Sequence, residues 1–471
     1  MHELIRQTAC SVVEKLRNGE VSPLELLDAL EQRIGQVDGK LNALPILCFD
    51  RARTHARTLM ERPTGARGLL AGLPVPIKDL IDVAGTRNTQ GSPIFRNKIA
   101  ETSDILVERI EQNGGVVYAR SNTPEFGAGA NTVNELFGAT LNPWNPARSA
   151  AGSSGGAAVA IAAGMAWVAH GSDMGGSLRN PASFCGVVGL RPSLGRVART
   201  PKSKIDRNLG IHGPMARNVE DVALLLDAMS GEHPADPLSL PAPAESFLTT
   251  TRTAKRPRRV AYSADLGITP VDPQIVEITR GAAARFVELG VIVEEAHPDL
   301  REAQECFHVL RAFDFAISKA ALLRSHRDLL KPDVVWNIEE GLKLSIEQLE
   351  RAEEQRVAMV VRVLKFFEKY DLLLTPATIV EPFPVANSHV MECDGRQFEN
   401  YVDWVAIAFA ITLVCCPAMS LPCGFTSSGL PVGLQMVAPP RADGQLLAGA
   451  KLLEDSLGLL GSTPIDLGLA T

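Results

Sequence analysis

Residues 171–186 read GSDMGGSLRNPASFCG, and the rest of the chain is best interpreted outward from this stretch. Ser177 follows two glycines among few bulky side chains, and such a backbone can come close to a ligand. The glycine pair leaves backbone N–H groups that can point at an incoming oxygen and hold a developing oxyanion. The nearest upstream histidine, His170, is linked to Ser177 by no motif. A nucleophilic Ser177 therefore needs another group to accept its proton.

Lys78 is the first candidate for that group. It ends the apolar run LPVPIK at 73–78, which predicts a buried strand followed by an exit turn. Burial disfavours the ammonium form and lowers the pKa of a lysine, so that a neutral Lys78 can serve as a general base. The alternative is that Lys78 reaches the surface from the end of its strand.

The stretch AGSSGG at 151–156 supplies two further serines, Ser153 and Ser154. One of them can relay a proton from Ser177 to a lysine. The stretch also matches G-x-S-x-G with Ser154 at the centre, which is the nucleophile-elbow pattern, but that pattern requires a strand directly before the serine. NPWNPARSAA at 142–151 is a poor strand. A flexible turn or an anion-binding nest is the third interpretation, whereas a Walker A loop is excluded because no GK[ST] follows.

Strands alternate with helices along the chain, and this order predicts a layered α/β fold. We expect a single domain over residues 1–471. Within it, residues 1–60 are expected to form a helical segment packed outside the core, and residues 232–258 a variable insertion or surface loop. MAWVAHGSD at 165–173 predicts a strand that ends close to Ser177.

Composition excludes several classes of protein. The net charge of −7 and a pI near 5.8 argue against nucleic-acid binding. No membrane span is predicted, because no run of about 18 apolar residues is free of charges and polar breaks. The charged N-terminus lacks the apolar core of a secretory signal. The eight cysteines are scattered without a CxxC pair, which favours a reduced, cytoplasmic protein without disulfides or a zinc site.

Three stretches in order carry a resemblance to a known family: Lys78, AGSSGGAAVAIAAGM at 151–165, and GSDMGGSLRNPASFCGVVGLRPSLGRV at 171–197. Together they resemble the amidase signature family of serine hydrolases. Further matching stretches are GLPVPIKDLIDVAG, NTPEFGAGANTVNELFGATLNPWN, GPMARNVEDVALLLDAMSG, YDLLLTPAT and LPCGFTSSGLPVGLQMVAPP. The resemblance covers most of the chain. It implies an α/β fold with a large mixed β-sheet flanked by helices in three layers, α/β/α.

The resemblance also implies roles for individual residues. Ser177 matches the nucleophile, Ser153 the bridging serine on a cis peptide bond, and Lys78 the terminal base. Backbone N–H groups that match the oxyanion hole are those of Met174, Gly175 and Gly176, with that of Ser177 as a further candidate. Side chains that match supporting residues are Ser154, Asp173 and Arg179. No metal and no cofactor are implied.

The chain departs from the family pattern at a few positions. Ala150 and Ala151 stand where the family usually has Pro-Gly, and Met174 replaces a common threonine. Thr412 and Cys415 occupy places where the family often has Asn and Gly. Only the backbone of Met174 is needed in the oxyanion loop, so we expect the chemistry to be retained and the substrate pocket to differ.

The reaction implied is hydrolysis of the C–N bond of a small-molecule amide, anilide or carbamate-like substrate, through an acyl-enzyme on Ser177. Two alternatives stay open: a glutaminase subunit of a tRNA-dependent amidotransferase, which needs a protein partner, and an esterase of the α/β-hydrolase type using Ser154. The expected partners are substrate and water, without nucleic acid or membrane, and a homodimer is compatible with the sequence. Candidate substrate-binding residues are Phe126, Gly127, Trp336 and Trp404, with Phe137 and Phe313 as further aromatic candidates from loop 123–145 and helical region 300–360.

Overall fold

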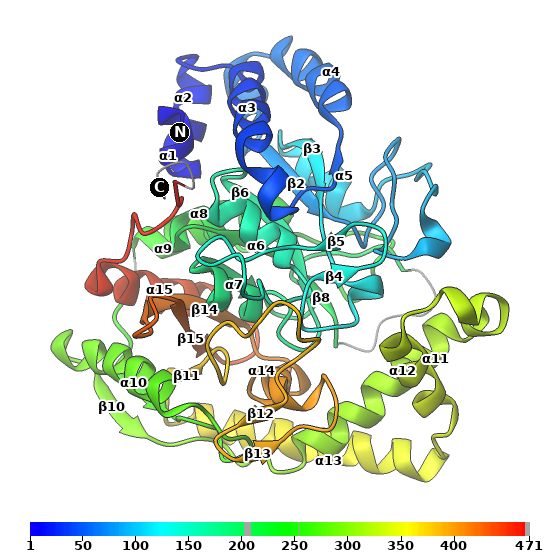
Figure 1. Ribbon diagram of the computed structural model, residues 1–471. Helices are drawn as coiled ribbons and strands as arrows, with labels where there is room; N and C mark the ends of the chain where they lie inside the picture. The colour runs from blue at the N-terminus through cyan, green and yellow to red at the C-terminus, as the bar shows by residue number, and fades with distance from the viewer. Residues whose placement is uncertain (202–208, 254, 467–471) are drawn as a thin grey trace.

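A mixed eight-stranded β-sheet lies at the centre of the computed structural model, which describes residues 1–201, 209–253 and 255–466 (Figure 1). The strand order is β10-β9-β11-β15-β14-β7-β8-β6. The neighbours β10, β9 and β11 run parallel, and all other neighbouring strands are antiparallel. The strand bounds are β6 Val168–Asp173, β7 Val188–Arg191, β8 Ile211–Ala216, β9 Arg259–Tyr262, β10 Ile292–Glu295, β11 Leu372–Pro376, β14 Ala418–Phe425 and β15 Pro431–Val437. This is the mixed α/β sheet that the sequence predicted.

A smaller sheet adds the strand that carries Lys78. Its order is β1-β3-β2, with β1 antiparallel and β2 parallel to β3. The bounds are β1 Ile46–Leu47, β2 Pro74–Lys78 and β3 Val116–Ser121. Strand β2 lies beside β6 at the end of the large sheet, so the two strand ends bring Lys78 close to Asp173. Two short hairpins are formed by β4 Val133–Asn134 with β5 Gly138–Ala139, and by β12 Glu392–Cys393 with β13 Arg396–Gln397.

Helices cover both faces of the large sheet. Helices α6 and α7 contact one face, and α8, α10 and α15 contact the other. Strand β15 contacts helices on both faces of the sheet. A Cβ at Gly433 would meet Ser183 of α7, whereas Met436, which points to the opposite face, lies near Gly449 of α15. The helix bounds are α1 Glu3–Arg6, α2 Ala9–Asn18, α3 Pro23–Leu41, α4 Phe49–Met60, α5 Ile105–Gln112, α6 Gly155–Ala162, α7 Arg179–Cys185, α8 Val219–Met229, α9 Phe247–Arg252, α10 Pro273–Glu288, α11 Ala303–His326, α12 Pro332–Leu342, α13 Ile346–Phe367, α14 Ala406–Leu413 and α15 Asp443–Leu457. Short 3-10 helices occupy Thr64–Ala66, Pro93–Phe95, Glu125–Gly127, Arg327–Leu329 and Asp403–Val405.

The N-terminal helices α1–α4 lie at one end of the molecule, and α11–α13 lie at the other (Figure 1). Helix α3 begins at a complete capping box, in which the Ser22 hydroxyl accepts from the Glu25 N–H and Glu25 bonds back. The N-terminal helices lie outside the large sheet but are not a separate unit. Their buried side chains, such as Val12, Leu16 and Leu30, belong to the same hydrophobic cluster as the sheet.

Among its described residues, the segment 232–258, expected to be a variable insertion or surface loop, contains the short helix α9. Residues 232–246 contain no helix or strand, but α9 then packs on α8 and α15 through the buried Phe247 and Thr251.

Among the described residues, no helix combines the length and the apolar character needed to cross a membrane.

Candidate active site

Strand β2 carries Lys78 into the interior, where its side chain is fully buried. Its Nζ donates to the hydroxyls of Ser153 at 2.7 Å, Ser154 at 2.8 Å and Ser172 at 3.2 Å. The alternative in which Lys78 reaches the surface is therefore wrong. A neutral amine has two N–H donors and one lone pair, so in that form Nζ can donate to only two of these three hydroxyls and can accept a proton from the third.

Burial lowers the pKa of Lys78 from 10.5 to about 7, although the nearby Asp173 carboxylate acts in the opposite direction. Near pH 7 and above, much of Lys78 is thus a neutral amine. The Ser154 hydroxyl already donates to the Ser172 carbonyl oxygen at 3.2 Å. Within the serine pair, Ser153 is therefore the hydroxyl whose proton can pass to the lysine.

The two adjacent serines have different environments. The Gly152–Ser153 peptide bond is cis, as the resemblance implied, and Ser153 lines a cavity. Ser154 is fully buried and is not part of the cavity lining. No strand leads directly into it, since the described residues between β5 and Ser154 contain no helix or strand. The nucleophile elbow that an esterase using Ser154 requires is therefore not formed.

Ser177 follows β6 and lies on the cavity wall, two residues before α7. Its carbonyl oxygen accepts a hydrogen bond from the Ser154 N–H at 3.2 Å, which fixes the loop against the serine pair. The proton relay proposed from the sequence requires the Ser153 and Ser177 hydroxyls to meet, but the Ser177 hydroxyl makes no hydrogen bond to Ser153 or to any other described residue. Catalytic hydrogen bonds are often long without substrate and tighten when it binds.

The loop between Asp173 and Ser177 was expected to supply oxyanion donors, and its hydrogen bonds show which of its N–H groups are available. The N–H of Gly176 donates to Asp173 Oδ1 at 3.0 Å and is therefore already used. Among the described residues, the N–H groups of Met174, Gly175 and Ser177 have no hydrogen-bond acceptor. These three groups, rather than Met174, Gly175 and Gly176, are the donors open to a substrate oxygen.

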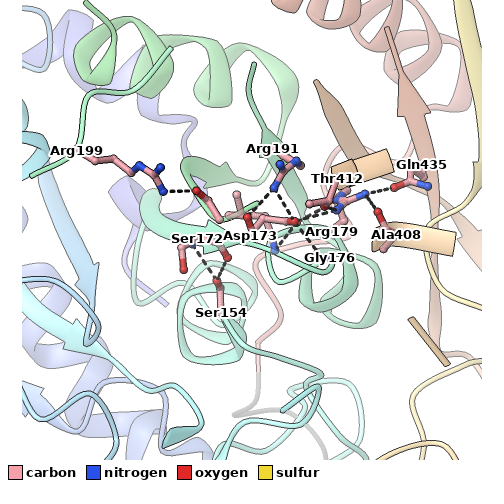
Figure 2. Close-up of polar contacts among 12 residues, drawn as sticks. Ser154, Ser172, Asp173, Gly176, Arg179, Arg191, Arg199, Ala408, Thr412 and Gln435 are labelled. Atoms are coloured by element: carbon pink, nitrogen blue, oxygen red, sulfur yellow. Dashed lines mark hydrogen bonds and ion pairs between the residues drawn. The ribbon is translucent and has the colours of Figure 1, made fainter. Parts of the chain in front are cut away.

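Asp173 is the anchor of this loop (Figure 2). Its carboxylate accepts from Arg179 Nη2 at 2.8 Å, from Arg179 Nε at 3.0 Å, from Arg191 Nη1 at 3.3 Å and from the N–H of Leu178 at 3.1 Å. Burial by itself would raise the pKa of Asp173, but the two guanidinium groups outweigh it and hold that pKa well below its usual range. The other contacts of Arg179 are the Ala408 carbonyl, the Thr412 hydroxyl and the Gln435 side chain (Figure 2).

His170 contacts the backbone of Lys78 and was not among the residues that the sequence selected. It is fully buried on β6, and its Nδ1 accepts the backbone N–H of Lys78 at 3.3 Å. Because Nδ1 accepts, the hydrogen of the neutral ring lies on Nε2, which is 3.0 Å from His212 Nδ1. Burial, with a contribution from Lys78, holds the pKa of His170 well below its usual value. His170 is thus a neutral positioning group.

The serines open into a cavity of about 700 Å³. Phe126 and Gly127 line it, as the sequence predicted, whereas Trp336 and Trp404 do not. Trp404 is buried in the core and stacks on Phe184, because a large apolar ring gains most from full burial. Trp336 packs edge-to-face on Tyr401, behind the cavity wall. Phe137 and Phe313 are also outside the lining.

One face of α11 forms much of the wall and was not identified by residue. The lining side chains of this helix follow a helical period: Phe307, Arg311, Asp314, Phe315, Ser318, Lys319, Ala321 and Leu322. The 3.6-residue repeat could have selected this face and excluded Phe313. Asn180 is a second missed residue: it is buried and lines the cavity, and its side-chain amide makes no hydrogen bond to any described residue.

Comparison with known proteins gives the same class of enzyme, an amidase, that the geometry of the site indicates. A family model described as Amidase matches residues 25–447. The chain is 34% identical to an acylamidase from Rhodococcus erythropolis over 95% of this chain and 94% of that protein. It is 30% identical to a glutamyl-tRNA(Gln) amidotransferase subunit from Halothermothrix orenii, over 98% and 99% of the two chains.

Among solved structures, a bacterial aryl acylamidase of the amidase signature family superposes with a TM-score of 0.90 at 26% identity, covering 98% of this chain and 99% of that one. The protein belongs to the amidase signature family. It is an amidohydrolase of this family, and the bonds from Lys78 to Ser153 and Ser154 fit a Ser-Ser-Lys arrangement.

Proposed function

We propose that the protein hydrolyses the C–N bond of small-molecule amides with apolar or aromatic substituents, including anilides. The observation that carries the proposal is the hydrogen bond between the buried Lys78 amine and Ser153. Ser153 and Ser177 both line the cavity. Phenylalanine rings and aliphatic side chains form much of the remaining lining: Leu80, Ile81, Phe95, Phe126, Phe307, Phe315, Leu322, Val402 and Val405. Such a lining favours an apolar acyl or amine portion.

The proposed steps follow from the order of the hydroxyls. Ser177 Oγ attacks the amide carbonyl, and its proton passes to Ser153 Oγ while the Ser153 proton passes to neutral Lys78. The N–H groups of Met174, Gly175 and Ser177 stabilise the oxyanion. The proton returns through Ser153 to the nitrogen as the C–N bond breaks. Water then attacks the acyl-enzyme by the same proton route and releases the acid.

A glutaminase subunit of a tRNA-dependent amidotransferase is the second candidate, because a relative of that class matches the whole chain at similar identity. The cavity lining contains more rings and aliphatic side chains than charged ones, and this favours the first candidate. An esterase using Ser154 is not proposed, because that hydroxyl is buried and bonded to Lys78.

The test is a substrate panel of 4-nitroacetanilide, benzamide, a phenyl carbamate, 4-nitrophenyl acetate and L-glutamine, measured by kcat/KM with Ser177→Ala as the control. We expect the anilide to be turned over at least about tenfold more efficiently than glutamine, and Ser177→Ala to lose all amide activity. Glutamine hydrolysis that exceeds anilide hydrolysis, or that appears only with a co-purifying partner, would support the second candidate instead.

A further inference from the structure

Three polar side chains from separate elements meet in the cavity wall. Arg311 comes from α11, Asn337 from α12, and Tyr401 from the segment before α14. Their exposed fractions are 7%, 2% and 5%, so all three are more than nine-tenths buried. Arg311 and Tyr401 line the cavity. Buried polar groups of this kind are expected to have every donor and acceptor satisfied.

The hydrogen bonds of this cluster determine the direction of each group. Arg311 donates through Nη1 to Asn337 Oδ1 and through Nη2 to the Tyr401 oxygen. Asn337 Nδ2 donates to the Asp333 carbonyl oxygen at 2.5 Å and to the Tyr401 oxygen at 2.7 Å. A guanidinium and an amide NH₂ group cannot accept, so the Tyr401 oxygen accepts both bonds. Its hydroxyl hydrogen is left to donate, and no described residue accepts it.

Arg311 also lacks a counter-charge. Among the residues that the structure describes, no Asp or Glu forms an ion pair with it, and its charge faces the rings of Phe315 at 4.6 Å and Tyr401 at 5.1 Å. Buried charges are nearly always paired, because an unpaired charge is costly to remove from water. An anionic group on a bound substrate would supply the missing charge and accept the Tyr401 hydrogen.

The position of Arg311 along α11 determines how far it lies from the oxyanion loop. The Phe307 ring lies 3.3 Å from where a Cβ on Gly175 would be, so Phe307 marks the oxyanion loop. Arg311 is one turn further along α11, about 6 Å away. We propose that Tyr401 and Arg311 bind a carboxylate of the substrate, one helical turn from the scissile carbonyl. The proposal rests on the proposed amidase function and adds to it a preference for anilide-type substrates that bear a carboxylate.

The test compares acids with neutral analogues of similar shape. Calorimetry on Ser177→Ala measures binding without turnover for two pairs: 4-acetamidobenzoate against 4-nitroacetanilide, and succinanilate against butyranilide. The second pair moves the carboxylate to the acyl side. We expect at least one acid to bind about tenfold more tightly than its neutral partner. Adding Tyr401→Phe should lower that preference about tenfold, because only the donating hydroxyl is removed.

Tyr262→Phe is the matched control, since Tyr262 is also buried and hydrogen-bonded, to Thr279, but does not line the cavity. It should leave the acid preference unchanged, whereas a merely structural Tyr401 would lower the affinity for both members of a pair equally. Equal affinity of acid and neutral analogue in both pairs would overturn the subsite, even if the enzyme hydrolyses anilides. Tyr401-dependent acid binding without any amide turnover by the native enzyme would retain the subsite and overturn the proposed function.

Discussion

The floor and the wall of the cavity are built in different ways. The catalytic floor, formed by Lys78, Ser153 and the loop 173–177, is fixed by many hydrogen bonds from two strand ends and the start of a helix. The wall is one face of α11 with Phe126 and Tyr401, and it combines rings and aliphatic groups with the charged side chains of Arg311, Asp314 and Lys319. The contrast indicates that the floor determines the reaction and the wall selects the substrate. Changes in the floor should therefore affect kcat, and changes in the wall should affect KM.

The largest effect is expected for Ser177→Ala. Turnover of an anilide should fall by about 10⁴-fold or more, because the nucleophile is lost. The free energy of unfolding should change little, since the Ser177 hydroxyl makes no hydrogen bond to a described residue. Kinetics together with urea unfolding measure both quantities.

A fluorophosphonate label identifies the nucleophile independently. The label should appear on Ser177 in the native enzyme and disappear in Ser177→Ala. A label on Ser154 would contradict the assignment of the floor.

Lys78 tests the proton route within the floor. Because its pKa is lowered to about 7, kcat/KM should be about tenfold lower at pH 6 than at pH 8 and level off at higher pH. The sign follows from the base being active only when it has lost its proton. Lys78→Arg should lose about 10³-fold in activity, because a guanidinium does not deprotonate in proteins. Native activity and an unchanged pH profile in Lys78→Arg would show that only the positive charge matters.

The burial of Lys78 and its contact with Ser153 agree with the sequence prediction, because the constraints on a buried lysine are local and chemical. A lysine at the end of an apolar strand needs polar partners when it is buried, and here the hydroxyls of Ser153, Ser154 and Ser172 supply them. The use of the Gly176 N–H by Asp173 was not predictable, because it depends on how the loop folds back on its own carboxylate. The role of His170 was not predictable either, because its bond to the Lys78 backbone depends on the packing of β2 beside β6.

The wall was predicted less well because aromatic residue type does not distinguish core from pocket. Trp404 and Trp336 pack against other rings, whereas Phe126 reaches the cavity. The helical period of α11 indicates which of its residues share a face and could line the cavity together. Its use would still have required knowing which helix face turns toward Ser177, and that depends on the packing of α11 on α14.

Asp173→Asn tests the electrostatic anchor of the floor. The change leaves two buried guanidinium groups, those of Arg179 and Arg191, without their carboxylate, and should lower the free energy of unfolding by about 3–5 kcal/mol. The pKa of Asp173 is depressed in the folded state, so its contribution is present above about pH 4 and is lost as the pH falls further. Urea unfolding from pH 7 to pH 3 should show a decline in the native enzyme that is weaker in Asp173→Asn. Parallel curves would contradict this role.

Phe126→Ala tests the wall. Removing the ring should lower kcat/KM for an anilide about tenfold, mainly through KM, because apolar contact with the substrate is lost. Phe137→Ala is the matched control, since Phe137 is also partly exposed in the same loop region but does not line the cavity. A fall in kcat without a change in KM would show that Phe126 belongs functionally to the floor.

The smallest effect concerns the backbone just before Ser153. Ala151 has a φ of 54°, in the left-handed region, at a position where the family usually has glycine. The neighbouring Ala150 is equally buried but has no positive φ. Changing either residue to glycine removes one buried methyl group and raises the conformational entropy of the unfolded chain by the same amount. Both destabilising contributions therefore cancel when the two variants are compared. The left-handed conformation costs an alanine about 1–2 kcal/mol, and only Ala151→Gly relieves it. Ala150→Gly should therefore be less stable than Ala151→Gly by about 1–2 kcal/mol in urea unfolding, whereas equal stabilities would mean that the floor holds Ala151 without strain.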